Sequence, residues 1–117
     1  MKRILLVDDE EAIHILYRQE LEDEGYKVYS ALTGEDAVRE VKMLSPDLVI
    51  LDINMPGING IEVLREIKRI NPKMPVILFS AYQEFKQDFG VWASDDYIVK
   101  STNSDDLKAA VRQLLSR

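Results

Sequence analysis

Cysteine is absent from this chain of 117 residues, so disulfide bonds, thiolate catalysis and cysteine-based metal sites are excluded. Long apolar runs are missing too. None approaches the roughly 20 residues of a membrane-spanning helix, and the run after Met1 ends at Asp8, which is too short for a signal-peptide core. We therefore expect no membrane insertion and a cytoplasmic location.

Basic residues are fewer than acidic ones. The chain has 15 lysines and arginines against 21 aspartates and glutamates, which gives a formal net charge of -6. Proteins that hold nucleic acid need clustered lysine and arginine to contact phosphates. We therefore expect no direct nucleic-acid binding, and any effect on DNA should come through a partner.

What is present is a regular alternation of two patterns. Short apolar runs, typical of strands buried on both faces, alternate with stretches whose apolar residues recur at helical spacing. The runs are 4–7, 26–30, 48–51, 76–79 and 97–99, and the helical stretches are about 11–24, 33–44, 61–70, 83–93 and 107–114. This pattern predicts one α/β domain over residues 1–117: a doubly wound, five-stranded parallel sheet of order 2-1-3-4-5 with five helices.

Ionisable residues follow several of the predicted strands. Asp8 and Asp9 come after the first run, Asp52 after the third and Lys100 after the fifth. Open parallel sheets bind ligands just outside the carboxyl ends of their strands, and this strand order places the switch point between strands one and three. We therefore expect these side chains to meet in one crevice.

The chemistry of such a crevice is restricted. Two carboxylates about 4 Å apart repel by roughly 4 kcal/mol at an effective dielectric near 20, so a cation is expected among them. Mg²⁺ fits best, because it prefers carboxylates, water and phosphate oxygens. Lys100 and the hydroxyl of Ser80, which ends the fourth strand, are placed to bind phosphoryl oxygens. Asp52 is the natural nucleophile for an aspartyl phosphate.

These residues resemble those of a known family. The pair Asp8-Asp9, the segment 52–60, Ser80 followed by Ala81, and the segment 96–100 are together similar to the receiver domains of two-component response regulators, which have the CheY-like fold. The resemblance spans essentially the whole chain. It implies that Asp52 accepts a phosphoryl group from a sensor histidine kinase or a phosphotransfer protein.

The resemblance also implies a metal site and a switch. Asp9, Asp52 and the backbone carbonyl of Asn54 would hold Mg²⁺, with Mn²⁺ as a substitute and Asp8 helping. Ser80 and Lys100 would contact the phosphoryl group while Tyr97 turns inward. This remodels the face formed by the fourth expected helix (83–93), the fifth strand (97–99) and the fifth helix (107–114), which controls a downstream protein target. Sequence alone leaves open the plainer interpretation of Tyr97 as a core aromatic.

The resemblance further implies a stoichiometric switch rather than an enzyme, with weak self-catalysed phosphorylation and dephosphorylation, acting as a monomer or a phosphorylation-dependent dimer. Asn54 and Tyr82 match positions that tune phosphoryl lifetime, and we expect Tyr82 to shield the phosphoryl group from water. Because the chain ends at Arg117, soon after the last helix, we expect a stand-alone regulator or phosphorelay intermediate, unless it was cut from a longer protein.

Three local features need an interpretation of their own. Most family members have proline after the lysine, but here Ser101 follows Lys100; a cis bond without proline costs roughly 2.5 to 4 kcal/mol, so we predict a trans bond and a rearranged loop. Asp8 with Glu11 also fits the spacing of a helix capping box. The lone histidine, His14, is expected on the helix surface rather than as a ligand.

Other functions fit less well. A phosphatase of the haloacid-dehalogenase type needs a second acid two residues after the nucleophile, where Asn54 stands, and a cap for which the chain is too short. A flavin or nucleotide carrier needs a phosphate-cradling loop, but the acidic run 8–11 would repel phosphate without a metal. An unphosphorylated receiver-like binding module stays open as the alternative.

Overall fold

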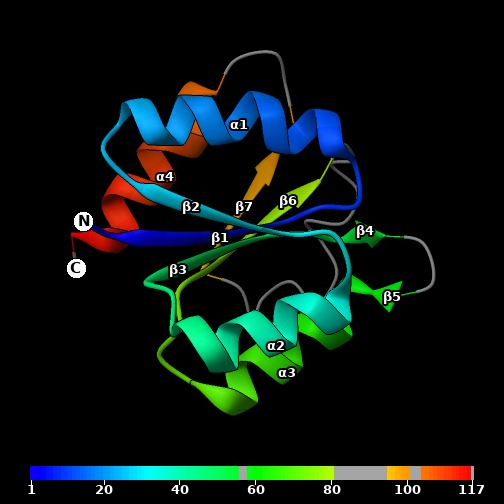
Figure 1. Cartoon of the computed structure of the whole chain (residues 1–117). Helices are drawn as coiled ribbons and strands as arrows, with labels where there is room; N and C mark the ends of the chain where they lie inside the picture. The colour runs from blue at the N-terminus through cyan, green and yellow to red at the C-terminus, as the bar shows by residue number, and fades with distance from the viewer. Residues whose placement is uncertain (56–57, 81–94, 101–103, 117) are drawn as a thin grey trace.

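The computed structural model describes residues 1–55, 58–80, 95–100 and 104–116. Five strands in this part of the chain form one sheet in the order β2-β1-β3-β6-β7, and every pairing is parallel (Figure 1). This confirms the predicted order 2-1-3-4-5. The strands are β1 (Arg3–Val7), β2 (Lys27–Ala31), β3 (Leu48–Asp52), β6 (Val76–Ser80) and β7 (Asp96–Val99).

Helices cover both faces of this sheet. Figure 1 shows α1 and α4 on one face and α2 and α3 on the other. Their bounds are α1 (Glu11–Asp23), α2 (Gly34–Leu44), α3 (Gly60–Ile70) and α4 (Asp105–Leu115). The described ranges thus carry four helices rather than the five expected, and the helix expected over 83–93 lies outside them. None of the helices described is both long enough and apolar enough to cross a membrane.

The core is divided between the two faces. In β1, Leu5 and Val7 pack toward α2 and α3, whereas Ile4 and Leu6 pack toward α1 and α4. All four are fully buried, as are the apolar residues of β3 and β6. Burying one such side chain contributes roughly 1.5 to 3 kcal/mol, which explains why these strands are apolar throughout instead of alternating with polar residues.

The buried stripe of α1 differs from the prediction. Leu16 lies at helical spacing from Ile13 and would share an inner face with Tyr17, but Leu16 is 51% exposed, and the buried residues are His14, Tyr17 and Leu21. These also recur at intervals of three and four, so the buried face of the helix includes the histidine that was expected on its surface.

The ends of the first two helices follow local rules only in part. The Thr33 hydroxyl accepts a hydrogen bond from the backbone N–H of Asp36 at 3.0 Å and caps α2. Gly25, with φ of +94°, follows the end of α1 in the left-handed conformation that favours glycine. The capping box proposed for Asp8 with Glu11 is wrong, because the N-cap residue of α1 is Glu10 and no side chain caps it.

The connection from β3 to α3 contains an unexpected hairpin. Strands β4 (Asn54–Met55) and β5 (Ile58–Asn59) pair antiparallel where the sequence suggested only a loop. Gly60 then begins α3 directly against the end of β3, since a Cβ there would lie 2.6 Å from the Cα of Ile53. Only glycine permits this approach without a backbone shift.

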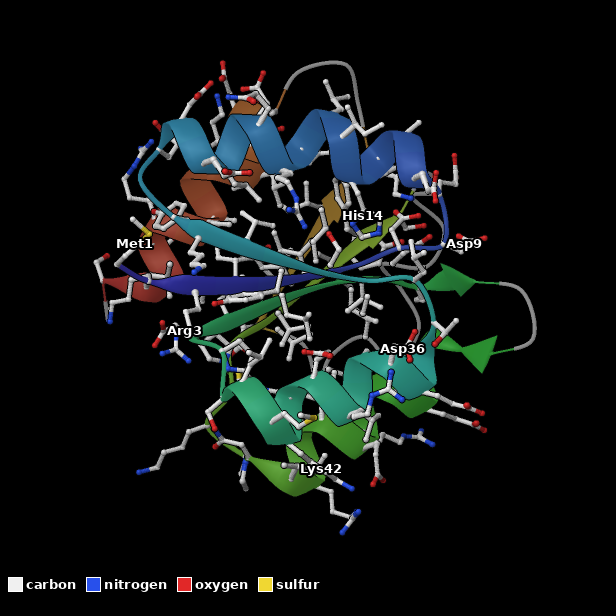
Figure 2. The ribbon with its side chains drawn as sticks, viewed as in Figure 1. Met1, Arg3, Asp9, His14, Asp36 and Lys42 are labelled. Carbon is white, nitrogen blue, oxygen red and sulfur yellow. The ribbon has the colours of Figure 1, made fainter. Side chains whose placement is uncertain are left out.

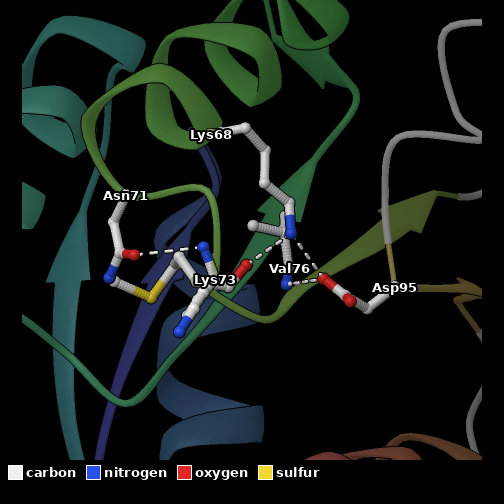
Figure 3. A network of polar contacts seen from close by, with 6 residues as sticks. Lys68, Asn71, Lys73, Val76 and Asp95 are labelled. Carbon is white, nitrogen blue, oxygen red and sulfur yellow. Dashed lines mark hydrogen bonds and ion pairs between the residues drawn. The ribbon is translucent and has the colours of Figure 1, made fainter.

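A polar network fastens the opposite, amino-terminal end of β6 and β7 (Figure 3). Lys68 of α3 donates to the backbone carbonyl of Met74 at 2.6 Å and pairs with the Asp95 carboxylate at 2.8 Å. The same Asp95 oxygen accepts from the backbone N–H of Val76 at 2.8 Å. The start of β7 is therefore tied to both α3 and β6.

Candidate functional site

Polar and charged side chains meet at the carboxyl ends of the strands. Asp8 follows β1, Asp52 ends β3, Ser80 ends β6 and Lys100 follows β7. Three of these lie within the core, with 0% of Asp8, 3% of Asp52 and 0% of Ser80 exposed. Buried carboxylates are costly unless they are paired, so their surroundings decide what the site can do.

Lys100 pairs with both buried carboxylates. Its Nζ lies 2.8 Å from Asp8 Oδ2 and 3.3 Å from Asp52 Oδ2, and its side chain is only 14% exposed. Burial acts to lower the pKa of Lys100, but the hydrogen bond to Asp8 and the charges of Asp52 and Asp8 outweigh it and hold this pKa above its usual value. The ammonium also lies 5.5 Å from the ring centroid of Phe79.

The backbone positions Lys100 as well. Ser80 pairs with Val99 in the register of β6 and β7, and the N–H of Lys100 donates to the carbonyl of Ser80 at 2.6 Å. The chain therefore reaches Lys100 in an extended, hydrogen-bonded conformation that places its side chain next to Asp8 and Asp52. Ser80 shares this edge of the sheet.

Asp8 is held from several sides. Its backbone N–H donates to the carbonyl of Ala31 in β2 at 3.1 Å, and its Oδ1 accepts from the backbone N–H of Glu10 at 3.0 Å. His14 contacts its carbonyl, with 2.7 Å between His14 Nε2 and Asp8 O. This corrects the prediction that His14 lies on the surface, since it is 7% exposed. Its spacing from Tyr17 and Leu21 fits the buried stripe of α1, but its polar side chain indicated a surface position.

The next two acids are exposed and form a group with Asp8. One carboxylate oxygen from each of Asp8, Asp9 and Glu10 lies within 4.8 Å of the others. All-oxygen donors of this kind suit a hard divalent cation such as Mg²⁺. Asp52 is outside this three-residue group but is connected to it through the shared contact of Lys100. Sequence reasoning gave Glu10 no role, although it lies in the acidic run 8–11.

Of the remaining residues singled out from the sequence, the structure describes Asn54 and Tyr97. Asn54 lies in β4, where its backbone pairs with Asn59, two residues beyond Asp52. Tyr97 lies in β7 opposite Leu78, half-buried against the apolar cluster on the side of α2 and α3. Tyr82 lies outside the described residues, and so does Ser101 with the geometry of the Lys100–Ser101 bond.

Comparison with known proteins identifies the family at this point. The family model for the response regulator receiver domain matches residues 4–112. The chain belongs to the response regulator receiver family. It is 36% identical over 118 residues to the alkaline phosphatase synthesis transcriptional regulatory protein PhoP of Bacillus subtilis, a match that covers 99% of this chain and 49% of PhoP. It is also 36% identical over 121 residues to the phosphate regulon transcriptional regulatory protein PhoB of Rhizobium meliloti, covering all of this chain and 53% of PhoB. The chain spans about half the length of these relatives.

Solved receivers have the same fold. The response regulator TrrA from Thermotoga maritima, in complex with Mg²⁺-BeF, superposes with a TM-score of 0.94 at 47% identity, covering 97% of this chain and 99% of TrrA. A structure of the histidine kinase ThkA in complex with TrrA gives a TM-score of 0.93 at 48% identity. The match covers 98% of this chain and 99% of the matched chain in that structure. The predicted resemblance to CheY-like receivers is therefore confirmed.

Proposed function

We propose that this receiver accepts a phosphoryl group on Asp52 from the phosphohistidine of a sensor kinase or a phosphotransfer protein. The observation that carries the proposal is the position of the Lys100 ammonium, 2.8 Å from Asp8 and 3.3 Å from Asp52 at the carboxyl edge of the sheet. This arrangement holds a carboxylate nucleophile beside a cation that can bind phosphoryl oxygens. The complex of TrrA with a histidine kinase supports a kinase as the donor.

The transfer step is a substitution at phosphorus. A carboxylate oxygen of Asp52 attacks the phosphorus atom, the bond from phosphorus to the histidine nitrogen breaks, and the leaving imidazole takes up a proton. Lys100 then pairs with oxygens of the aspartyl phosphate, and the Ser80 hydroxyl donates to another. Slow attack of water on phosphorus restores the Asp52 carboxylate and releases inorganic phosphate, so one chain carries one phosphoryl group at a time.

The donor set fits a bound Mg²⁺ ion, with Mn²⁺ as a substitute. Asp8, Asp9, Asp52 and the carbonyl of Asn54 would hold it. The grouping of Asp8, Asp9 and Glu10 oxygens within 4.8 Å supports Asp8 and Asp9 in this set. When bound, the cation offsets negative charge on the phosphoryl oxygens. The Mg²⁺-BeF complex of the similar receiver TrrA agrees with this chemistry.

Phosphorylation would act by shifting a population between two states. Moving a ratio of 1:99 to 99:1 takes about 5.5 kcal/mol, whereas one charge-assisted hydrogen bond supplies roughly 1.5 to 3 kcal/mol. Rearrangement of Ser80 and Tyr97 is therefore completed by binding of a downstream protein to the face that includes β7 and α4.

Two further expectations stay predictions. One is the cytoplasmic location of the protein, and the other is the role of Tyr82 in tuning the lifetime of the phosphoryl group.

Intact mass spectrometry after incubation with acetyl phosphate and Mg²⁺ tests the acceptor. We expect one phosphoryl adduct on the wild-type chain, none on Asp52→Asn and an unchanged adduct on Asp23→Asn, a control at an exposed carboxylate. An adduct that persists in Asp52→Asn would mean that another residue is the acceptor. No adduct with any divalent cation would favour the unphosphorylated binding module.

A further inference from the structure

We propose that His14 is a positioning residue for the cation site, which it orders by holding the connection from β1 to α1 that carries Asp8 and Asp9. The inference rests on the proposed function in that it assumes a cation bound at these acids. Figure 2 shows His14 between α1 and the sheet, on the side of the molecule where Asp9 lies.

The hydrogen bond of His14 has a defined direction. A carbonyl oxygen only accepts, so the Nε2 atom 2.7 Å from Asp8 O carries the proton and donates it. The other ring nitrogen, Nδ1, is buried and has no hydrogen-bond partner among the described residues. The polar interaction that orients this ring is therefore the one with Asp8.

This hydrogen bond connects the residue that follows β1 with a residue inside α1. Asp8 also contacts Ala31 of β2, Lys100 after β7 and the Glu10 amide before α1. Of these four described partners of Asp8, His14 is the one that lies within α1. Because Glu10 provides no side-chain cap, the start of α1 is not fastened to the preceding loop in the usual way.

Asp9 depends on that connection. It is exposed, and it lies between Asp8, which is fixed to the sheet, and Glu10, which leads into α1. The position of its carboxylate therefore follows the position of α1 relative to β1. By holding the Asp8 carbonyl to the second turn of α1, His14 keeps the oxygens of the three-acid group within the 4.8 Å separation seen here.

Substitution of His14 should have different effects if the histidine only packs in the core and if it positions metal ligands. In the first case substitution changes stability and leaves the affinity of the folded protein for Mg²⁺ unaltered. In the second case the affinity falls, because partners that orient metal ligands typically change it by about 10- to 100-fold when they are removed.

Glutamine and methionine separate these cases. Both side chains reach as far from Cβ as Nε2 does, but only His14→Gln retains an N–H donor at the end. Isothermal titration calorimetry with Mg²⁺ on the full unphosphorylated chain gives the affinity, and urea unfolding without metal gives the stability. We expect His14→Met to weaken Mg²⁺ binding by about 10-fold or more and His14→Gln to restore most of it.

Three results would contradict the inference. If His14→Met bound Mg²⁺ as tightly as the wild-type chain does, His14 would be a packing residue only, whatever the change in stability. Equal loss in the methionine and glutamine variants would show that the donor is not the cause. No Mg²⁺ binding by the wild-type chain would overturn the proposed function along with the inference. If His14→Met does not fold, His14→Asn, whose shorter side chain cannot bring its N–H to the same point, takes its place in the comparison.

Discussion

Replacing Lys100 with methionine leaves two buried carboxylates without their cation. Asp8 and Asp52 are 0% and 3% exposed, so water cannot substitute for the ammonium that lies 2.8 and 3.3 Å from them. Removing one partner of a buried ion pair typically costs 3 to 5 kcal/mol. We expect Lys100→Met to lower the free energy of unfolding by about 3 kcal/mol at pH 7 without metal, measured by urea denaturation.

The pH dependence of this loss identifies its cause. Without Lys100, the folded state of the variant holds two negative charges side by side in the core, and the repulsion between them grows with the charge that the two carboxyl groups carry. A fall in pH reduces that negative charge and therefore reduces the repulsion. In the wild-type chain the raised pKa of Lys100 keeps its contribution intact up to about pH 10. The deficit of the variant should therefore shrink from pH 8 to pH 5.

Lys68→Met is the matched control. Lys68 also lies 2.8 Å from a carboxylate, that of Asp95, but both side chains are 21% exposed and water hydrates the acid that remains. We expect a smaller loss that stays constant between pH 5 and pH 8. A deficit in Lys100→Met that is equally large at pH 5 and pH 8, or smaller than that of Lys68→Met, would refute the reasoning. Saturating Mg²⁺ should stabilise Lys100→Met more than it stabilises Lys68→Met, because the bound cation also offsets the charge of the carboxylates that Lys100 no longer pairs.

Three further predictions concern stability. Gly60→Ala places a Cβ 2.6 Å from backbone at the end of β3, so urea unfolding should show a loss of about 1 to 3 kcal/mol. Thr33→Ala removes the cap of α2 and should cost about 1 kcal/mol in the same assay. Hydrogen bonds from Lys108 and Ser104 lower the pKa of Glu20, so its contribution is present above the unfolded pKa near 4.3 and is lost as pH falls through the folded pKa. Stability of Glu20→Gln should therefore decline less than that of wild type between pH 5 and pH 3.

The sheet was predictable because its strands are buried on both faces. An apolar run such as 48–51 is best interpreted as a buried strand when helical stretches precede and follow it. The strand order then follows from the connections. The same logic placed Asp8, Asp52 and Lys100 at one edge. The pairing of Lys100 with both acids required the actual register of β7 and therefore had to come from the structure.

The errors have specific physical causes. His14 was assigned to the surface because a single polar residue on a helix is usually solvated, yet a carbonyl at the end of β1 lies within its reach. That contact joins residues six apart across a turn, and no periodic pattern encodes it. The antiparallel pair of β4 and β5 was not predicted, because each of these strands has two residues, too few to show alternation.

The two ends of β7 are held in different ways, and this bears on how a phosphoryl group would be sensed. At its start, Asp95 is tied to Lys68 and to the backbone of Val76, away from the acids. At its other end, Lys100 is held by the charges of Asp8 and Asp52 and by one backbone hydrogen bond to Ser80. In the proposed function, phosphorylation of Asp52 would alter the second set of contacts, because Asp52 belongs to that set and not to the first. Because the start of the strand is fixed independently, the response of β7 should be largest from Tyr97 to Lys100, where a strand at the edge of the sheet meets the site.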